Sequence, residues 1–163
     1  MKQGIFLLIV LSMFISCSLI KEGGGEKTIP LSNEQLDKVV HESVSDLLKE
    51  LWVSDFLLQH NERPILMTSS FTNPTKAMVN IQELYGKVEM NLIESGQVRV
   101  VKSNQLQRNT PPTILAAGKS VNYVLSATFE KKTETKPPVL VFHLSLWNEN
   151  SPTPITTISK EID

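Results

Sequence analysis

Residues 121–148 read VNYVLSATFEKKTETKPPVLVFHLSLWN, and this stretch decides the fold of the chain. From Val121 to Phe129 every second side chain is apolar, and the same alternation returns from Leu140 to Leu146. A charged loop that ends in two prolines separates the two halves. Alternation with a period of two is typical of strands that bury one face. Because a short connection favours antiparallel pairing, this stretch predicts a β-hairpin whose apolar face covers a core.

Further strands are predicted on both sides of this hairpin. A final strand that ends at Ile162 would extend it to an antiparallel meander, since its connection is also short. Upstream, residues 64–71 and 97–102 are short apolar runs next to turn residues, which is typical of strands. The expected inward face of the first of these carries Ile65, Met67 and Phe71.

A first helix is predicted ahead of all the strands. Ser32 and Gln35 have the spacing of a capping box, in which each side chain bonds the other's backbone N–H. Apolar residues then recur at helical spacing as far as Leu51. The apolar content continues over residues 52–58, which we interpret as a second short turn or helix that ends at Asn61.

A second long helix is predicted between the upstream strands. Asn80 is a suitable N-cap with Glu83 three residues later, and Gly96 stands where a left-handed residue would end the helix. The order helix, strand, helix, then strands favours the α+β class. We therefore expect residues 32–163 to form a single α+β domain, with helices packed on an antiparallel sheet of about four strands.

The N-terminal residues have the pattern of a bacterial lipoprotein signal. Lys2 precedes an apolar run over residues 4–16, which is shorter than the roughly 20 residues that span a bilayer. Phe14–Ile15–Ser16–Cys17 resembles a relaxed lipobox, with the single cysteine of the chain at its end. We predict a signal peptide at 1–16 and a thioether between Cys17 and a diacylglycerol, with acyl chains such as palmitate. An uncleaved anchor, or an ordinary signal peptide with a chance cysteine, is the alternative.

A flexible tether is predicted between the lipid and the domain. Residues 17–31 contain the lipidated cysteine and then Gly23–Gly24–Gly25 among charged residues, a composition typical of flexible coil. Such a tether reaches about 45–50 Å when fully extended. The formal net charge of the chain is −1, which argues against nucleic-acid binding, because such proteins carry a basic face.

No catalytic or cofactor-binding motif stands out. His41, His60 and His143 lack the spacing of metal ligands, so a solvated or hydrogen-bonded role is expected for each. No phosphate-binding glycine loop and no nucleophilic serine motif is present. The charged residues 130–136 are interpreted as a solvated hairpin loop or a partner contact. Elimination therefore favours a binding or regulatory protein with no cofactor and no metal.

Four short stretches in the expected order, behind a lipobox, carry a family resemblance. They are Arg63–Leu66, Asn73–Thr75 with Val79–Asn80, Glu94–Val101 and Tyr123–Ala127. Together they resemble the penicillin-binding-protein activator lipoproteins of the LpoB type, over roughly residues 36–162. Three features depart from that family: Asn80 replaces a small acidic residue, residues 154–162 lack tryptophan, and the tether is short rather than long and proline-rich.

The resemblance implies a lipoprotein without catalytic activity, at the periplasmic face of the outer membrane. It would bind a bifunctional peptidoglycan synthase, a penicillin-binding protein, and stimulate its glycosyltransferase and transpeptidase activities. The implied fold is akin to the N-terminal domain of the translocation protein TolB. Two other hypotheses remain open, a secretion-related lipoprotein and a surface-displayed ligand-binding lipoprotein, neither of them an enzyme.

Overall fold

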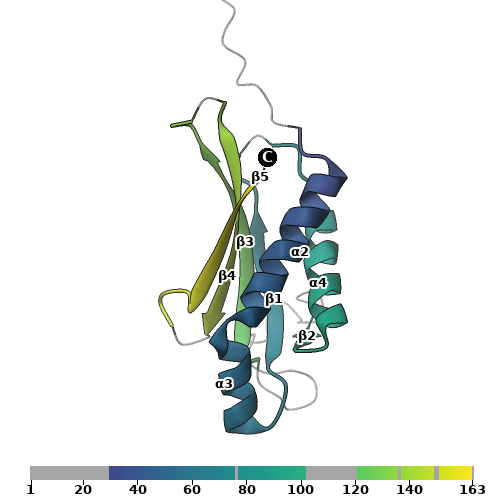
Figure 1. Ribbon diagram of the computed structural model, residues 1–163, viewed down its shortest axis with the longest axis vertical. Helices are drawn as coiled ribbons and strands as arrows, with labels where there is room; N and C mark the ends of the chain where they lie inside the picture. The colour runs from purple at the N-terminus through teal and green to yellow at the C-terminus, as the bar shows by residue number, and fades with distance from the viewer. Residues whose placement is uncertain (1–29, 76, 102–120, 136, 149–150, 163) are drawn as a thin grey trace, which may run out of the picture.

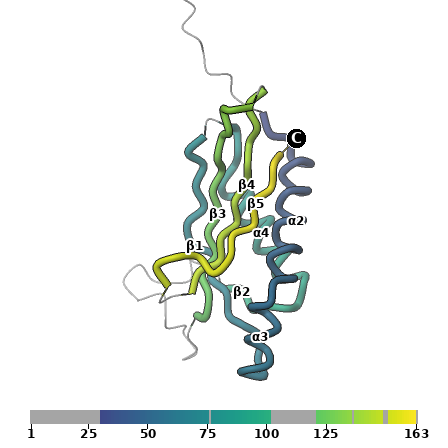
Figure 2. Tube along the Cα trace, turned by 60° about the vertical axis from the view of Figure 1, so that its left-hand side comes forward, coloured from purple at the N-terminus to yellow at the C-terminus, as the bar shows by residue number. Residues whose placement is uncertain are grey.

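The computed structural model describes residues 30–75, 77–101, 121–135, 137–148 and 151–162 (Figure 1). Two layers are visible, a sheet and a layer of helices that covers one of its faces (Figures 1 and 2). The helices are α2 (Asn33–Lys49), α3 (Leu51–His60) and α4 (Ile81–Ser95). The strands are β1 (Ile65–Thr72), β2 (Arg99–Val101), β3 (Tyr123–Lys132), β4 (Val139–Asn148) and β5 (Thr156–Ile162). The α+β class is therefore confirmed.

The sheet has five strands in the order β2-β1-β3-β4-β5. The meander from β3 to β5 is antiparallel, as predicted. However, β1 pairs in parallel with both β2 and β3, so the prediction of an antiparallel sheet of about four strands was wrong. For the β1–β2 pair the physical reason is the connection between the two strands, which contains the whole of α4. A crossover of that length returns the chain in the same direction, whereas a tight turn reverses it.

The β3–β4 hairpin buries the face that the alternation predicts. Pairing runs from Tyr123 opposite Asn148 to Lys132 opposite Val139. The inward face of the pair is buried against the helices, and Phe129 and Phe142 lie there with ring centroids 5.2 Å apart. The buried face of the hairpin is thus the centre of the core, as the sequence indicated.

A β-bulge changes the inward face of β1. Thr68 pairs with Leu125 and Phe71 with Ala127, so β1 has one more residue than β3 over this interval. Leu66 and Phe71 belong to the core, whereas Ile65 and Met67 lie on the opposite face, so the prediction that they share a face with Phe71 was wrong. The Tyr85 hydroxyl on α4 accepts from the Phe71 N–H and donates to the Ser69 carbonyl, and so it pairs two backbone groups that the bulge frees.

The predicted helix ends are present. The Ser32–Gln35 capping box is complete in both directions, with bonds of 3.0 and 3.1 Å. The Asn80 side chain accepts from the N–H groups of Gln82 and Glu83, and Gly96 has the left-handed φ of 64° that ends α4. A new feature is Glu50, whose extended backbone separates α2 from α3 (φ −63°, ψ 152°).

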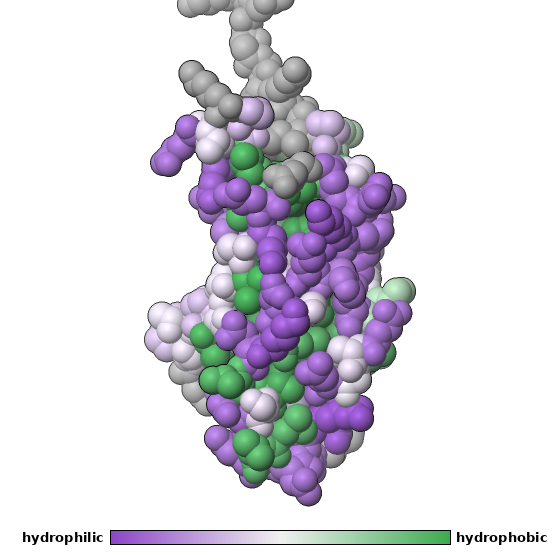
Figure 3. Space-filling model, viewed as in Figure 1, coloured by the Kyte–Doolittle hydropathy of each residue, from purple (hydrophilic) through white to green (hydrophobic). Residues whose placement is uncertain are grey.

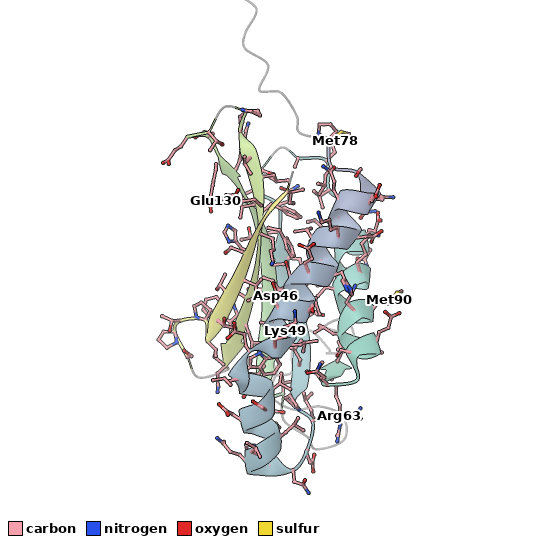
Figure 4. All side chains as sticks on the ribbon, viewed as in Figure 1. Asp46, Lys49, Arg63, Met78, Met90 and Glu130 are labelled. Atoms are coloured by element: carbon pink, nitrogen blue, oxygen red, sulfur yellow. The ribbon has the colours of Figure 1, made fainter. Side chains whose placement is uncertain are left out.

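An ion pair joins the first helix to the last strand. Asp46 on α2 accepts from Lys160 on β5 and, at 3.1 Å, from Lys49 (Figure 4). Hydrogen bonds from Lys160, and then from Lys49, hold the pKa of the Asp46 carboxyl below its usual value. This pair ties the edge strand β5 to the helix layer. On the buried face of the same helix, the hydroxyl of Ser43 is fully buried and has no hydrogen-bond partner among the described residues.

Candidate functional site

The histidines lie on three different elements, and each makes a hydrogen bond, as expected. His41 on α2 bonds the Asn91 amide oxygen on α4 over 2.9 Å. His143 on β4 lies 2.8 Å from the Ser159 hydroxyl and 3.0 Å from the Glu130 carboxylate. His60 stacks on Phe56 at the end of α3. Within the ranges that the structure describes, no three His, Cys, Asp or Glu side chains gather into a metal-binding group.

The predicted lipidation site, Cys17, lies outside the described residues, as do the predicted signal peptide and nearly all of the tether. The described chain begins at Pro30, which forms a parallel bridge with Met78. Met78 lies at the end of the molecule opposite α3 (Figure 4). The chain therefore joins the domain at one end, and α3 forms the other end.

The α3 end of the molecule exposes an unusual amount of apolar surface. Most residues of α3 are apolar, yet only Trp52 and Val53 are buried. The exposed fractions of Leu51 and Leu58 are 73% and 84%. Figure 3 shows hydrophobic side chains gathered at this lower end of the domain. Exposed apolar residues that lie together on a small domain are typical of a protein-interaction surface.

An aromatic cluster continues this surface towards the sheet. The ring of Tyr123, the first residue of β3, contacts Trp52 and Phe56 edge-on, with centroid distances of 5.0 and 5.8 Å. The Trp52 indole N–H donates to the Leu47 carbonyl over 2.8 Å, which fixes the ring across the junction between α2 and α3. Burial, and then the negative charge of Asp55, raise the pKa of the Tyr123 hydroxyl.

A hollow of about 470 Å³ lies beside the aromatic cluster. The end of β4 and the turn before β5 complete its wall, where Ile155 is exposed. The apolar run over residues 52–58 predicts a short turn or helix, but its pattern does not identify an exposed binding surface. The high proportion of apolar residues could have indicated an exposed apolar surface, because an amphipathic helix of that length needs fewer of them to cover a core.

The sheet face that the helices leave uncovered (Figure 2) is different in character, because hydroxyl groups of neighbouring strands pair across it. The hydroxyls of Ser145 and Thr157 lie 2.9 Å apart, and the Trp147 indole N–H donates to the Ser126 hydroxyl over 2.8 Å. These groups are paired with one another across neighbouring strands. These polar side chains therefore already have hydrogen-bond partners within the sheet, and the α3 end is the stronger candidate for a binding site.

Comparison with known proteins gives one family match. A family model described as the peptidoglycan-synthase activator LpoB matches residues 35–137, which is more than half of the chain. The match begins within the first turn of α2, covers the remaining elements as far as β3, and stops before β4. No curated protein matches the chain significantly.

Two solved structures with low sequence identity are similar to this chain. The C-terminal domain of LpoB from Escherichia coli is 16% identical, with a TM-score of 0.49, over 76% of this chain and 98% of that one. The same domain from Salmonella enterica is 15% identical, with a TM-score of 0.48 and the same coverage. Among the described helices, none is long and apolar enough to cross a membrane.

Proposed function

This chain belongs to the family of peptidoglycan-synthase activators named LpoB, and from that membership we propose that it binds and activates a bifunctional peptidoglycan synthase. The partner is a penicillin-binding protein, and the result of the contact is control of cell-wall synthesis. The observation that carries the proposal is the family match over residues 35–137. A fold akin to the N-terminal domain of TolB is part of the same proposal.

A protein that activates an enzyme by binding to it needs a binding surface, and it does not need catalytic groups of its own. A bound protein speeds its partner only if it binds the active conformation more tightly than the inactive one. The described residues offer such a surface at the α3 end, where Leu51 and Leu58 stand exposed beside the aromatic cluster. Burial of these side chains against the active form of the synthase would supply the differential affinity.

We propose the following organisation for the rest of the chain. Residues 1–16 are a signal peptide, residues 17–31 carry the lipid on Cys17 and act as the tether, and residues 32–163 are the activating domain. Acyl chains on Cys17 would hold the protein on the membrane, at about 0.8 kcal/mol for each buried methylene. The membrane is the outer one, at its periplasmic face. Because Pro30 joins the domain opposite α3, the α3 end would face away from that membrane.

A reconstituted synthase assay tests this function. The full-length lipoprotein in detergent is added to a purified bifunctional synthase from the same bacterium, and glycan polymerisation and peptide crosslinking are followed separately. We expect both rates to rise at micromolar concentrations, together with formation of a complex. Neither a rate change nor a complex at those concentrations would contradict the proposal.

A further inference from the structure

The hollow beside α3 has the composition of a site for a positively charged group. Three aromatic side chains, Trp52, Phe56 and Tyr123, line it together with the carboxylate of Asp55. Its volume of about 470 Å³ lies within the range of roughly 300–1,000 Å³ that ligand sites occupy. The faces of aromatic rings carry partial negative charge, so they attract the ammonium group of lysine and the guanidinium group of arginine.

The charges around the hollow agree with this assignment. Asp55 forms no ion pair with any residue in the described ranges, and its charge acts on the neighbouring Tyr123 hydroxyl. Among the described residues that line the hollow, none is lysine or arginine, and the imidazole of His60 stacks on Phe56. An anionic ligand would meet the Asp55 carboxylate and aromatic faces, with the His60 imidazole as the one basic group among the described lining residues, whereas a cation would gain both an ion pair and cation–π contacts.

The hollow also lies beside exposed apolar surface. Leu51 and Leu58 belong to the same short helix as Asp55 and Phe56, and Ile155 is exposed on the opposite wall. A free cation such as a metal ion or a small amine would leave these side chains in water. A protein segment would cover them while its basic side chain occupies the hollow. The combination of apolar rim and anionic centre thus favours a protein partner.

We propose that the hollow beside α3 binds a lysine or arginine side chain of the synthase, while apolar side chains next to that residue pack on Leu51 and Leu58. The identity of the partner rests on the proposed function, whereas the chemistry of the site rests on the residues that line the hollow. The helix α3, which carries Asp55 and Phe56, lies at the end of the domain opposite the attachment of Pro30.

A peptide titration tests the chemistry without the synthase. Full-length protein in detergent is titrated with acetyl-Leu-Arg-Leu-amide and with the same peptide carrying citrulline, which has the shape of arginine but no charge. Backbone amide resonances report the position of binding. We expect the arginine peptide to shift the resonances of Asp55, Phe56 and Tyr123, and to bind about threefold to fivefold more tightly than the citrulline peptide.

Two variants separate the charge of the site from the general charge of the protein. Asp55→Asn removes the carboxylate from an exposed helix position and should abolish the preference for arginine. Glu134→Gln removes another exposed carboxylate, from the loop between β3 and β4, and should preserve the preference for arginine. Circular dichroism verifies that both variants fold. Equal affinity for the two peptides, shifts that map elsewhere, or an unchanged preference in Asp55→Asn would overturn the site.

The synthase assay is kept as a separate measurement. If the wild-type protein prefers the arginine peptide but does not stimulate the synthase, the site stands and the proposed function fails. If it stimulates the synthase without any preference for arginine, the function stands and this site fails. If both hold, Asp55→Asn should raise the concentration needed for half-maximal stimulation by about threefold to fivefold.

Discussion

Replacement of Leu58 by serine should weaken binding to the synthase without loss of stability. A leucine side chain that passes from full exposure to full burial contributes about 1.5–3 kcal/mol. Because 84% of Leu58 is exposed in the free domain, most of that free energy is still available for docking. Its loss corresponds to about 1.3–2.5 kcal/mol, or a dissociation constant raised roughly tenfold to seventyfold.

The same exposure predicts a small effect on folding. Leu58 makes few contacts that the substitution could remove, so the free energy of unfolding should change by no more than about 0.5 kcal/mol. Titration calorimetry with the purified synthase measures the affinity, and thermal unfolding measures the stability. The two measurements together distinguish a lost contact surface from a damaged fold.

Met90→Ser is the matched control, because it also removes an exposed apolar side chain from a helix. Met90 is 59% exposed on α4 and lies away from the α3 end (Figure 4). We expect this variant to bind the synthase as the wild type does. If Met90→Ser weakens binding as much as Leu58→Ser, or if Leu58→Ser binds normally, the assignment of the docking surface to the α3 end is wrong.

Three further predictions concern the core, the ion pair and the anchor. Ser43→Ala removes a buried hydroxyl that has no partner among the described residues, so the free energy of unfolding, measured by thermal unfolding, should stay unchanged or rise by about 1 kcal/mol; a clear loss of stability would show that the hydroxyl is paired after all. The lowered pKa of Asp46 means that its ion pair with Lys160 stabilises the fold above about pH 4 and loses this effect as the pH falls through the folded-state pKa. Asp46→Asn should therefore flatten the acid limb of the stability profile, by a small amount because the pair is partly exposed, and a limb identical to that of the wild type would contradict this role. Cys17→Ala should lose fatty-acid labelling and move the protein to the soluble fraction unless the uncleaved signal peptide retains it, whereas unchanged labelling would refute the proposed acylation site.

The exposure of the α3 end could not be predicted from the sequence. Residues 52–58 were recognised as apolar and helical, but apolar residues in a helix usually indicate a core. Whether Leu58 is buried depends on what packs against α3, and no local pattern contains that information. Similarly, Tyr123 was predicted to lie on a strand, yet its contact with Trp52 and Phe56 joins parts of the chain about seventy residues apart.

The sequence by itself determined the helix caps at Ser32 and Asn80, the left-handed end at Gly96 and the buried face of the β3–β4 hairpin. Each of these depends on groups that lie a few residues apart or on a period-two pattern that one short loop connects. Only the tertiary structure decided that β1 lies in parallel between β2 and β3, that a bulge places Leu66 on the same face as Phe71, and that a hollow forms beside α3. These features arise from backbone pairing and side-chain packing between segments that are distant in the sequence. The free energy of such packing is spread over many contacts, so no short sequence motif encodes it.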